Sequence, residues 1–347
     1  MALIRISQWP EPIEAGRMRI LEAALDAGVP YPHGCGSGEC GSCKSQLLSG
    51  EVTLDRYSPD ALSDAERERG VILACRARVT SDVHVKWLSA ATTLPMVKLS
   101  ARVASVKRVA HDVIVLSLTL PLGASMAFRP GQFAKLRFGK LPTRSYSMAN
   151  QPSQGRLEFH IRMVPNGLVS QYVATDLKTS DVVEVRGPFG EAYWDTIDDV
   201  KQDPLLLLAG GTGLAPILSV LGAALREGQP AEQIHVYHGV RSERDLYAGT
   251  QLTEHAREKG FRFVPVYSSA AERMARTGLL HEAVAEDFSS LASTRIHVAG
   301  PPPMVDAVKD LALRRGATVA RIRADAFYPA EPEKKSLWER ITGWSDL

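Results

Sequence analysis

The sequence has little cysteine, almost no net charge and no long hydrophobic run. Only four of its 347 residues are cysteine, and 41 basic residues nearly balance 39 acidic ones, for a formal net charge of +2. So small a net charge does not indicate nucleic-acid binding. No run approaches the roughly 18 apolar residues of a membrane helix, and the start, MALIRISQWPEPIE, lacks the apolar core of a secretory signal. We therefore expect a cytoplasmic protein that binds neither nucleic acid nor a membrane.

Three of the four cysteines lie within nine residues, in the stretch CGSGECGSC. The four are Cys35, Cys40, Cys43 and, after a long gap, Cys75. This spacing is that of a plant-type 2Fe–2S cluster. The three intervening glycines allow backbone N–H groups to approach the sulfurs in conformations that side chains would obstruct. A structural zinc site is the alternative, but such sites usually repeat a CxxC pair. We predict that the four cysteines ligate a 2Fe–2S cluster.

The first 90 residues resemble the β-grasp fold of plant-type ferredoxins. LIRI predicts a strand, MRILEAALDAG a helix ended by Gly28, and SDAERERG a short helix with a capping box from Ser63 to Glu66. KSQLLSGEV and VILACRARV predict two more strands, the second of which carries Cys75. A small, polar segment that contains proline follows at 91–97, and we predict that it is a linker.

A second domain is predicted over residues 98–202. VIVLSLTL, GQFAKLRF, RLEFHIRMV and DVVEVRG are short alternating runs separated by turn residues, which favours an antiparallel β-barrel. Within it, RSYS at 144–147 is compatible by itself with an exposed strand end whose arginine forms a salt bridge. About twenty residues later, Gly167 and Ser170 begin a helix whose free N–H groups can receive a phosphate.

A third domain is predicted over residues 203–328. LLLLAG, IHVYHG, FRFVPVY, RIHVAG and VARIR alternate with helical stretches, which is typical of a doubly wound parallel sheet. The first strand runs into GGTGLAP, a glycine turn placed where a dinucleotide pyrophosphate binds in such sheets. The turn is not GxGxxG, and close packing alone would also explain it. VAGPPPMV, at 298–305, borders the same crevice. The fold class is therefore multidomain, α+β and α/β.

These motifs together resemble the ferredoxin–NADP reductase superfamily. RSYS, HIR, the GLVS helix start and GPFG at 187–190 match its flavin domain. The resemblance implies that Arg144 pairs with the flavin pyrophosphate, Tyr146 lies against the isoalloxazine and Ser147 hydrogen-bonds near flavin N5. The other residues of the implied FAD site are Ser145, His160, Ile161, Arg162, Gly167, Leu168, Val169 and Ser170. FAD is expected rather than FMN.

GGTGLAP, GVRSERDLY and VAGPPPMV match the pyridine nucleotide domain of the same superfamily. The implied nucleotide-binding residues are Gly211, Thr212, Gly213, Pro216, Arg241, Asp245, Gly300, Pro301 and Met304. Many members carry cysteine where this chain has Ala299, but hydride transfer needs no protein acid or base because the cofactors carry the chemistry. Arg241 and Arg244 favour a ribose phosphate, whereas Glu243 and Asp245 oppose one, and we expect NADH rather than NADPH.

An aromatic residue near the carboxyl end often stacks on the flavin in this superfamily. Phe327, in RADAFYPA, is the candidate here, and with Ser147 it makes up the predicted catalytic residues. Simple interdomain packing by Phe327 or Tyr328 is the alternative. In the tail, residues 329–347, Leu337, Ile341 and Trp344 recur at helical spacing and predict a short amphipathic helix that braces the molecule.

The order ferredoxin, flavin domain, nicotinamide domain resembles the reductase components of bacterial ring-hydroxylating dioxygenases, such as those for naphthalene, benzoate and terephthalate. The resemblance implies an NADH:acceptor oxidoreductase that passes electrons through FAD and a 2Fe–2S cluster to a terminal Rieske-type oxygenase, directly or through a separate ferredoxin. A haem-thiolate monooxygenase, a diiron hydroxylase or a CDP-sugar deoxygenation enzyme is the alternative partner. The alternative that is not an enzyme is a zinc-stabilised adaptor with a degenerate flavin fold. We expect a monomer.

Overall fold

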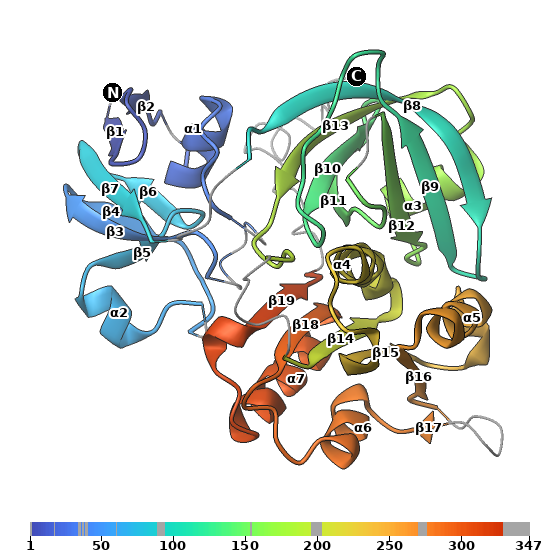
Figure 1. The fold of residues 1–347 in the computed structure, drawn as a ribbon. Helices are drawn as coiled ribbons and strands as arrows, with labels where there is room; N and C mark the ends of the chain where they lie inside the picture. Colours follow the sequence, from blue (N-terminus) through green and yellow to red (C-terminus); the bar gives the residue numbers. More distant parts are fainter. Residues whose placement is uncertain are drawn as a thin grey trace.

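The computed structural model shows three units in chain order (Figure 1). It describes residues 2–16, 18–33, 36, 38, 41–59, 61–88, 94–152, 155–195, 203–269 and 276–328. The predicted ligands Cys35 and Cys40 and the predicted helix of the tail, 329–347, therefore lie outside the described residues. Within the described ranges, no helix is long and apolar enough to cross a membrane.

The first unit is a mixed five-stranded sheet with a helix packed on it. Its strands follow the order β2–β1–β7–β3–β5, and β1 and β7 pair in parallel in the centre. The bounds are β1 Leu3–Ile6, β2 Ile13–Glu14, α1 Ile20–Asp26, β3 Lys44–Ser49, β4 Val52–Leu54, α2 Asp64–Glu68, β5 Val71–Leu73, β6 Ala77–Val79 and β7 Val83–Trp87. Helix α1 buries its apolar residues in the core of this sheet. The predicted β-grasp layout is confirmed.

Two strand predictions in this unit are wrong in extent. KSQLLSGEV divides into β3 and β4 at Gly50, whose φ is +86° and where an added Cβ would lie 2.0 Å from the carbonyl oxygen of Asp82. VILACRARV divides into β5 and β6, so that Cys75 lies in the intervening turn and not on a strand. Apolar runs of this kind predict extended backbone but do not reveal a tight turn inside the run.

The second unit is an antiparallel barrel. Its order is β11–β10–β13–β8–β9–β12, and an isolated bridge between Met148 and Phe159 brings the two edge strands together. The bounds are β8 Val97–Arg108, β9 Val113–Thr119, β10 Phe133–Phe138, β11 Arg144–Ser147, β12 Arg156–Arg162, α3 Leu168–Thr175 and β13 Val182–Phe189. Alternate residues of β12 point into the apolar core of the barrel. The predicted barrel is confirmed.

The third unit is a parallel sheet in the order β17–β16–β15–β14–β18–β19. The bounds are β14 Leu205–Gly210, α4 Leu214–Arg226, β15 Ile234–Val240, α5 Gly249–Lys259, β16 Arg262–Tyr267, β17 Arg276–Thr277, α6 Leu280–Asp287, β18 Arg295–Gly300, α7 Pro302–Arg314 and β19 Ile322–Ala326. Helices α4 and α5 pack on one face, and α6 and α7 on the other. The strand order reverses between β14 and β18, and ligands of such sheets bind at the carboxyl end of that switch point.

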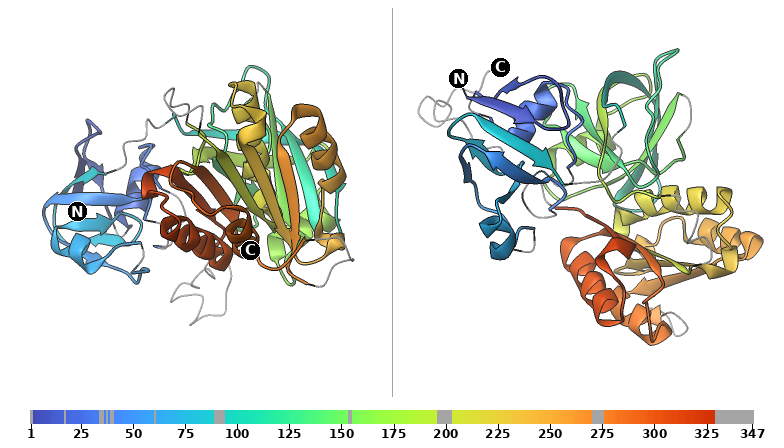
Figure 2. Two further views of the ribbon diagram at one scale, coloured as in Figure 1. Left: turned by 60° about the horizontal axis from the view of Figure 1, so that its bottom comes forward. Right: turned by 60° about the vertical axis from the view of Figure 1, so that its left-hand side comes forward.

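The three units lie against one another (Figure 2). Both apolar and polar side chains make the contacts between them. Phe133 and Phe189 of the barrel belong to the same buried cluster as the core of the first unit. Between the barrel and the parallel sheet, the Ser219 hydroxyl donates to the Asn150 carbonyl at 2.7 Å. The His160 ring is hydrogen-bonded to the Tyr247 hydroxyl at 3.0 Å in the same interface. These contacts set the relative positions of the sites described next.

Candidate functional site

Two of the four predicted cluster ligands lie side by side. Cys43 immediately precedes β3, and Cys75 follows β5 in the turn that leads to β6. Strands β3 and β5 pair, and the N–H of Ala74 donates to the carbonyl of Cys43 at 3.1 Å. Both cysteines are buried. The fold therefore brings together two cysteines that are 32 positions apart in the sequence, as a shared cluster requires.

The glycines of the cysteine motif have the geometry that a tight loop around a cluster needs. Gly36, Gly38 and Gly41 all have φ in the left-handed region, at +71°, +84° and +74°. A Cβ at Gly38 would lie 2.8 Å from Cγ of Arg76, and one at Gly41 would lie 3.0 Å from the Ala61 carbonyl. Conformation disfavours side chains at all three positions, and lack of space adds to this at Gly38 and Gly41 but not at Gly36. The donor set and its loop fit a 2Fe–2S cluster.

The RSYS motif forms the edge strand β11. The Arg144 guanidinium donates to the carbonyl of Thr143 at 2.9 Å, and no carboxylate of the described residues pairs with it. The described residues therefore offer no support for the salt-bridged alternative. Tyr146 is half-buried, and burial raises the pKa of its hydroxyl to about 12, so it stays neutral. A planar cation without an anionic partner beside a neutral aromatic ring fits a flavin with a pyrophosphate.

Ser147 has a partner that the sequence did not reveal. Its hydroxyl donates to a carboxylate oxygen of Asp325 at 3.0 Å, although the two residues are 178 positions apart. Asp325 lies on β19, two positions before Phe327, and burial raises the pKa of its carboxyl to about 6. This pair joins the predicted flavin strand to the parallel sheet. The only sequence signal was an acidic residue beside the predicted aromatic.

The loop before α3 is held by Ser170. The N–H of Val164 donates to the Ser170 hydroxyl at 3.1 Å, and that hydroxyl donates to the carbonyl of Gly167 at 3.1 Å. A Cβ at Gly167 would lie 2.6 Å from the Ser170 oxygen. Glycine and serine thus fold the chain tightly before the helix. The N–H groups at the start of α3 donate to no capping side chain of the described residues, which suits a phosphate site.

The other residues of the implied FAD site divide between two faces. Ile161 and Val169 are buried in the barrel core, whereas Leu168 is 60% exposed. The side chains of His160 and Arg162 point toward the parallel sheet instead, to Tyr247 and to a cavity described below. Ser145 is exposed on β11. The side chains of His160, Ile161 and Arg162 are therefore directed to the parallel sheet, the barrel core and the cavity, respectively.

The glycine turn after β14 has two separate uses. A Cβ at Gly213 would lie 2.0 Å from the carbonyl oxygen of Ala299, and one at Gly300 would lie 2.9 Å from the Gly210 carbonyl. These glycines let β14, β18 and α4 pack closely. Gly211 has φ +54°, and the nearest atom to its added Cβ would be an Arg162 nitrogen at 3.7 Å. Its backbone faces open space, so close packing explains Gly213 but not Gly211.

We expect Gly213→Ala to destabilise the third unit strongly. The new methyl group would overlap backbone that cannot swing away, and overpacking of this kind costs about 3 kcal/mol of unfolding free energy. Gly228→Ala is the matched control. Its added methyl group would meet no atom within 4 Å, so only the positive φ of this position should lower the unfolding free energy, by about 1 kcal/mol. Denaturant unfolding measures both. Equal stability of the two variants would contradict this packing argument.

A cavity of about 210 Å³ opens at the carboxyl end of the sheet. Of the predicted nucleotide-binding residues, it is lined by Gly211, Thr212, Arg241, Asp245, Pro301 and Met304, together with Arg162 of the barrel. Gly213, Gly300 and Pro216 are not among its lining residues, and Pro216 is buried in α4. The cavity lies at the switch point, with glycine backbone and two arginines facing it. This donor set fits a dinucleotide phosphate.

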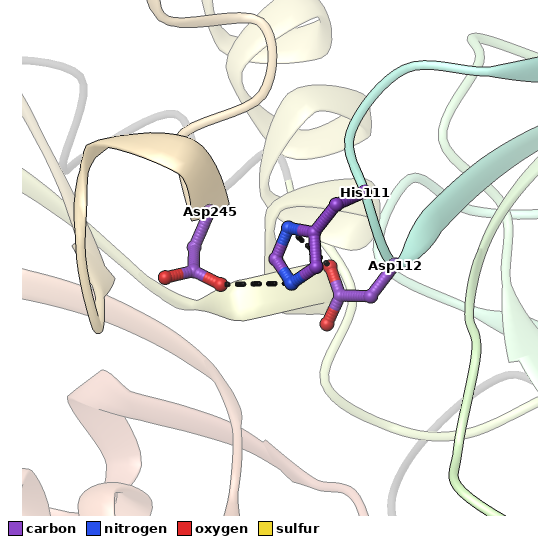
Figure 3. Close-up of side chains that lie close together, drawn as sticks. All are labelled: His111, Asp112 and Asp245. Carbon is purple, nitrogen blue, oxygen red and sulfur yellow. Dashed lines mark ion pairs between the residues drawn. The ribbon is translucent and has the colours of Figure 1, made fainter.

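A charged cluster at the cavity joins the barrel to the parallel sheet (Figure 3). His111 and Asp112 precede β9, and a His111 ring nitrogen lies 3.6 Å from a carboxylate oxygen of Asp245 in the third unit. Asp112 also pairs with the Arg162 guanidinium at 2.9 Å. Asp245 accepts from the Ser242 N–H at 2.9 Å. Asp245 therefore has structural partners on both sides of the domain boundary, which its place in the motif did not predict.

Phe327 lies at the junction of the second and third units. Its N–H donates to the carbonyl of Gly300 at 2.9 Å, and its side chain packs on a cluster that contains Ala299 and Val113. It is partly buried. The residue thus ends the strand next to the switch point and within two positions of Asp325. This placement is compatible with both the flavin-stacking and the packing interpretation.

Asp325→Asn should stabilise the protein, increasingly so as the pH rises. The folded-state pKa of Asp325 is raised to about 6, so the folded chain holds this proton more tightly than the unfolded chain, and stability falls as the carboxyl ionises. Relative to the wild type, the unfolding free energy of the variant should be higher by up to about 3 kcal/mol above pH 6 and unchanged below pH 4. Asp306→Asn, exposed on α7, is the control. If the difference in unfolding free energy between Asp325→Asn and the wild type does not change with pH, the raised pKa of Asp325 is wrong.

Family models match all three units. Residues 7–80 match a 2Fe–2S iron–sulfur cluster binding domain, residues 100–194 an oxidoreductase FAD-binding domain and residues 207–310 an oxidoreductase NAD-binding domain. The predicted cofactors, a 2Fe–2S cluster, FAD and NAD, are confirmed at the level of these domains. The zinc-stabilised adaptor is not supported by them.

Relatives cover nearly the whole chain. The reductase subunit of an aromatic O-demethylase from Amycolatopsis is 38% identical over 90% of this chain and 94% of its own. The reductase component of the naphthalene 1,2-dioxygenase system of Pseudomonas putida is 33% identical over 92% and 95%. Among solved structures, an Amycolatopsis cytochrome P450 reductase superposes with a TM-score of 0.82 and 35% identity, covering 95% of this chain and 100% of that one. The chain thus belongs to the family of flavin-dependent iron–sulfur oxidoreductases that fuse a 2Fe–2S ferredoxin domain to FAD-binding and NAD-binding domains.

Proposed function

We propose that this chain passes electrons from NADH to a terminal oxygenase that acts on an aromatic compound. The observation that carries the proposal is the end-to-end similarity to reductase components of aromatic oxygenase systems, at 33–38% identity over about nine-tenths of the chain. When bound, NADH supplies a hydride to FAD, and FAD passes the two electrons one at a time to the 2Fe–2S cluster. The residues of the chain align the cofactors and shield them from water.

The sites are assigned to domains as follows. Residues 1–90 hold the cluster, 98–202 the flavin and 203–328 the nicotinamide, with 91–97 as a linker; the matched family segments fall inside these limits. The Arg144 guanidinium, which has no carboxylate partner among the described residues, takes the pyrophosphate of FAD, and Ser147 takes the place next to flavin N5. Gly211 and Arg241 receive the dinucleotide in the 210 Å³ cavity. Phe327 covers the meeting point of flavin and nicotinamide.

A Rieske-type oxygenase is the proposed acceptor, reached directly or through a separate ferredoxin. A haem-thiolate oxygenase is the second candidate, because the cytochrome P450 reductase of Amycolatopsis has the same three-domain architecture over the full length of its chain. We propose that the chain acts as a monomer in the cytoplasm in either case. The relatives at 30–32% identity include the reductase component of a propane 2-monooxygenase and the reductase of a CDP-6-deoxy-hexulose-3-dehydrase.

A reconstitution experiment distinguishes the acceptors. The loaded protein is mixed with NADH and either the naphthalene dioxygenase of Pseudomonas putida, with and without its ferredoxin, or the oxygenase subunit of the Amycolatopsis O-demethylase. NADH oxidation is compared with the yield of oxygenated product. Tight coupling with the dioxygenase supports the first proposal, and coupling with the O-demethylase alone supports the second. If NADH oxidation yields only reduced oxygen with every partner, the oxygenase proposal is wrong.

A further inference from the structure

The ferredoxin domain meets the barrel through aromatic side chains. Phe133 on β10 and Phe189 at the end of β13 are cross-strand partners, and their ring centroids lie 5.7 Å apart. Both side chains are more than nine-tenths buried and belong to the core cluster of the ferredoxin domain. Large apolar rings of one domain thus complete the core of another, so the contact is packed like a protein interior.

His33 meets these rings from the ferredoxin side. Its ring is 3% exposed and lies 4.7 Å from the Phe189 ring, between centroids, at an interplanar angle of 59°. One ring nitrogen, Nδ1, donates to the Tyr31 carbonyl at 2.8 Å, which fixes the ring orientation. The other, Nε2, is buried and has no hydrogen-bond partner among the residues that the structure describes. The tilted ring pair with Phe189 is therefore a direct contact between His33 and the barrel.

Polar contacts hold the same junction. The Arg186 guanidinium donates to the carbonyl of Leu25 in the last turn of α1, where helix carbonyls lack partners within the helix. The ammonium group of Lys135 lies 4.9 Å from the centroid of the Phe189 ring. The two cations and the ring come from neighbouring strands, β10 and β13. They orient the ferredoxin domain on this side of the barrel.

The two ends of the aromatic series point to the two cofactor sites. His33 is separated from Cys35, a predicted cluster ligand, by a single residue. At the other end, Phe133 is the Cα partner of Ser147 on β11, which is the residue assigned to flavin N5. His33, Phe189 and Phe133, here called the aromatic path, therefore connect the cysteine loop with the flavin strand through buried contacts.

We infer that the aromatic path holds the cluster against the flavin and carries the electrons between them. Electron tunnelling falls steeply with distance and is faster through packed atoms than through gaps, so a close-packed junction of rings favours transfer here. Each transfer moves one electron from the reduced flavin to the cluster, where one iron(III) becomes iron(II). The cluster holds one electron at a time, so the second transfer follows after a one-electron acceptor outside the chain has reoxidised the cluster, and the flavin proton passes to solvent. His33 is a positioning residue in this scheme.

The inference rests on the proposed placement of FAD at Ser147 and of the cluster at the cysteines. Its test uses the full chain loaded with FAD and cluster, without any oxygenase. After anaerobic mixing with NADH, flavin absorbance follows hydride transfer, and cluster absorbance with electron paramagnetic resonance follows reduction of the cluster. Small-angle X-ray scattering of the same variants reports whether the domains stay docked.

The informative variants are Phe189→Leu and His33→Leu, which remove a ring but keep apolar volume. Both should leave flavin reduction by NADH unchanged and slow cluster reduction several-fold, whether or not the radius of gyration increases. Phe189→Tyr and His33→Phe keep the rings and should restore the wild-type rate. Phe138→Leu is the matched control, because Phe138 lies on the same strand as Phe133 but is buried in the barrel core. It should leave cluster reduction unchanged.

Wild-type rates in both leucine variants, or equal slowing in Phe138→Leu, would overturn the aromatic path. That outcome is distinct from failure of the proposed function. If the wild-type protein lacks iron or FAD, the cofactor assignment itself is wrong. If NADH reduces both cofactors in every variant at the same rate, only the aromatic path is wrong.

Discussion

Cys75→Ser is expected to abolish electron transfer to a one-electron protein acceptor while leaving the flavin reducible by NADH. Cys75 is buried in the turn after β5, beside Cys43, and serine cannot provide a thiolate for iron. Changes to groups that merely support metal ligands cost about 10–100-fold, so loss of a ligand should cost at least that much. Iron content and cytochrome c reduction measure the loss, and ferricyanide reduction measures the flavin.

Ser45→Ala is a suitable control for Cys75→Ser. Ser45 is also buried in this domain, and among the described residues its hydroxyl bonds the Tyr31 hydroxyl and the Cys43 carbonyl. It should lower stability by about 1 kcal/mol and leave iron content near that of the wild type. Undiminished iron in Cys75→Ser, with normal cytochrome c reduction, would show that Cys75 is not a cluster ligand.

Arg144→Ala should weaken FAD binding by roughly 10–100-fold. A hydrogen bond to a charged group contributes about 1.5–3 kcal/mol, and each 1.4 kcal/mol is tenfold in affinity. The Arg144 fork has no carboxylate partner in the described chain, so its removal takes away a phosphate contact without exposing an unpaired acid. FAD retention on gel filtration and flavin fluorescence titration measure the effect.

Two further variants test the geometry of that contact. Arg144→Lys keeps the charge but loses the planar fork, and its affinity should fall between those of the wild type and Arg144→Ala. Arg156→Ala removes an exposed arginine of the same barrel, on β12, and should bind FAD normally. If Arg144→Ala retains FAD as firmly as Arg156→Ala does, Arg144 does not hold the pyrophosphate.

Local patterns predicted the three units because each pattern has a local cause. The spacing of the cysteines reflects a cluster geometry, alternation in RLEFHIRMV reflects one buried face, and the apolar run LLLLAG reflects a strand covered on both sides. The same logic failed for Cys75, because a turn of three residues inside VILACRARV leaves no mark on hydrophobicity. Both interpretations of the glycine turn, close packing and dinucleotide binding, apply to different residues: Gly213 is packed and Gly211 faces a cavity.

The contacts between domains could not be read from the sequence. Ser147 and Asp325 are 178 positions apart, and His160 and Tyr247 are 87 apart. No periodicity links such residues, since periodicity reports only on neighbours along one element. The same is true of His33 and Phe189, whose rings meet only because the ferredoxin domain packs against β10 and β13. These pairs decide how the cofactor sites are aligned.

The central claim is that one chain couples nicotinamide, flavin and iron. An anaerobic titration with NADH, followed by absorbance and electron paramagnetic resonance after metal and flavin analysis, tests it most directly. We predict two iron atoms and one FAD per chain, bleaching of the flavin, and a cluster signal that grows with added NADH. Zinc in place of iron, or a flavin that NADH reduces without any cluster signal, would contradict the account.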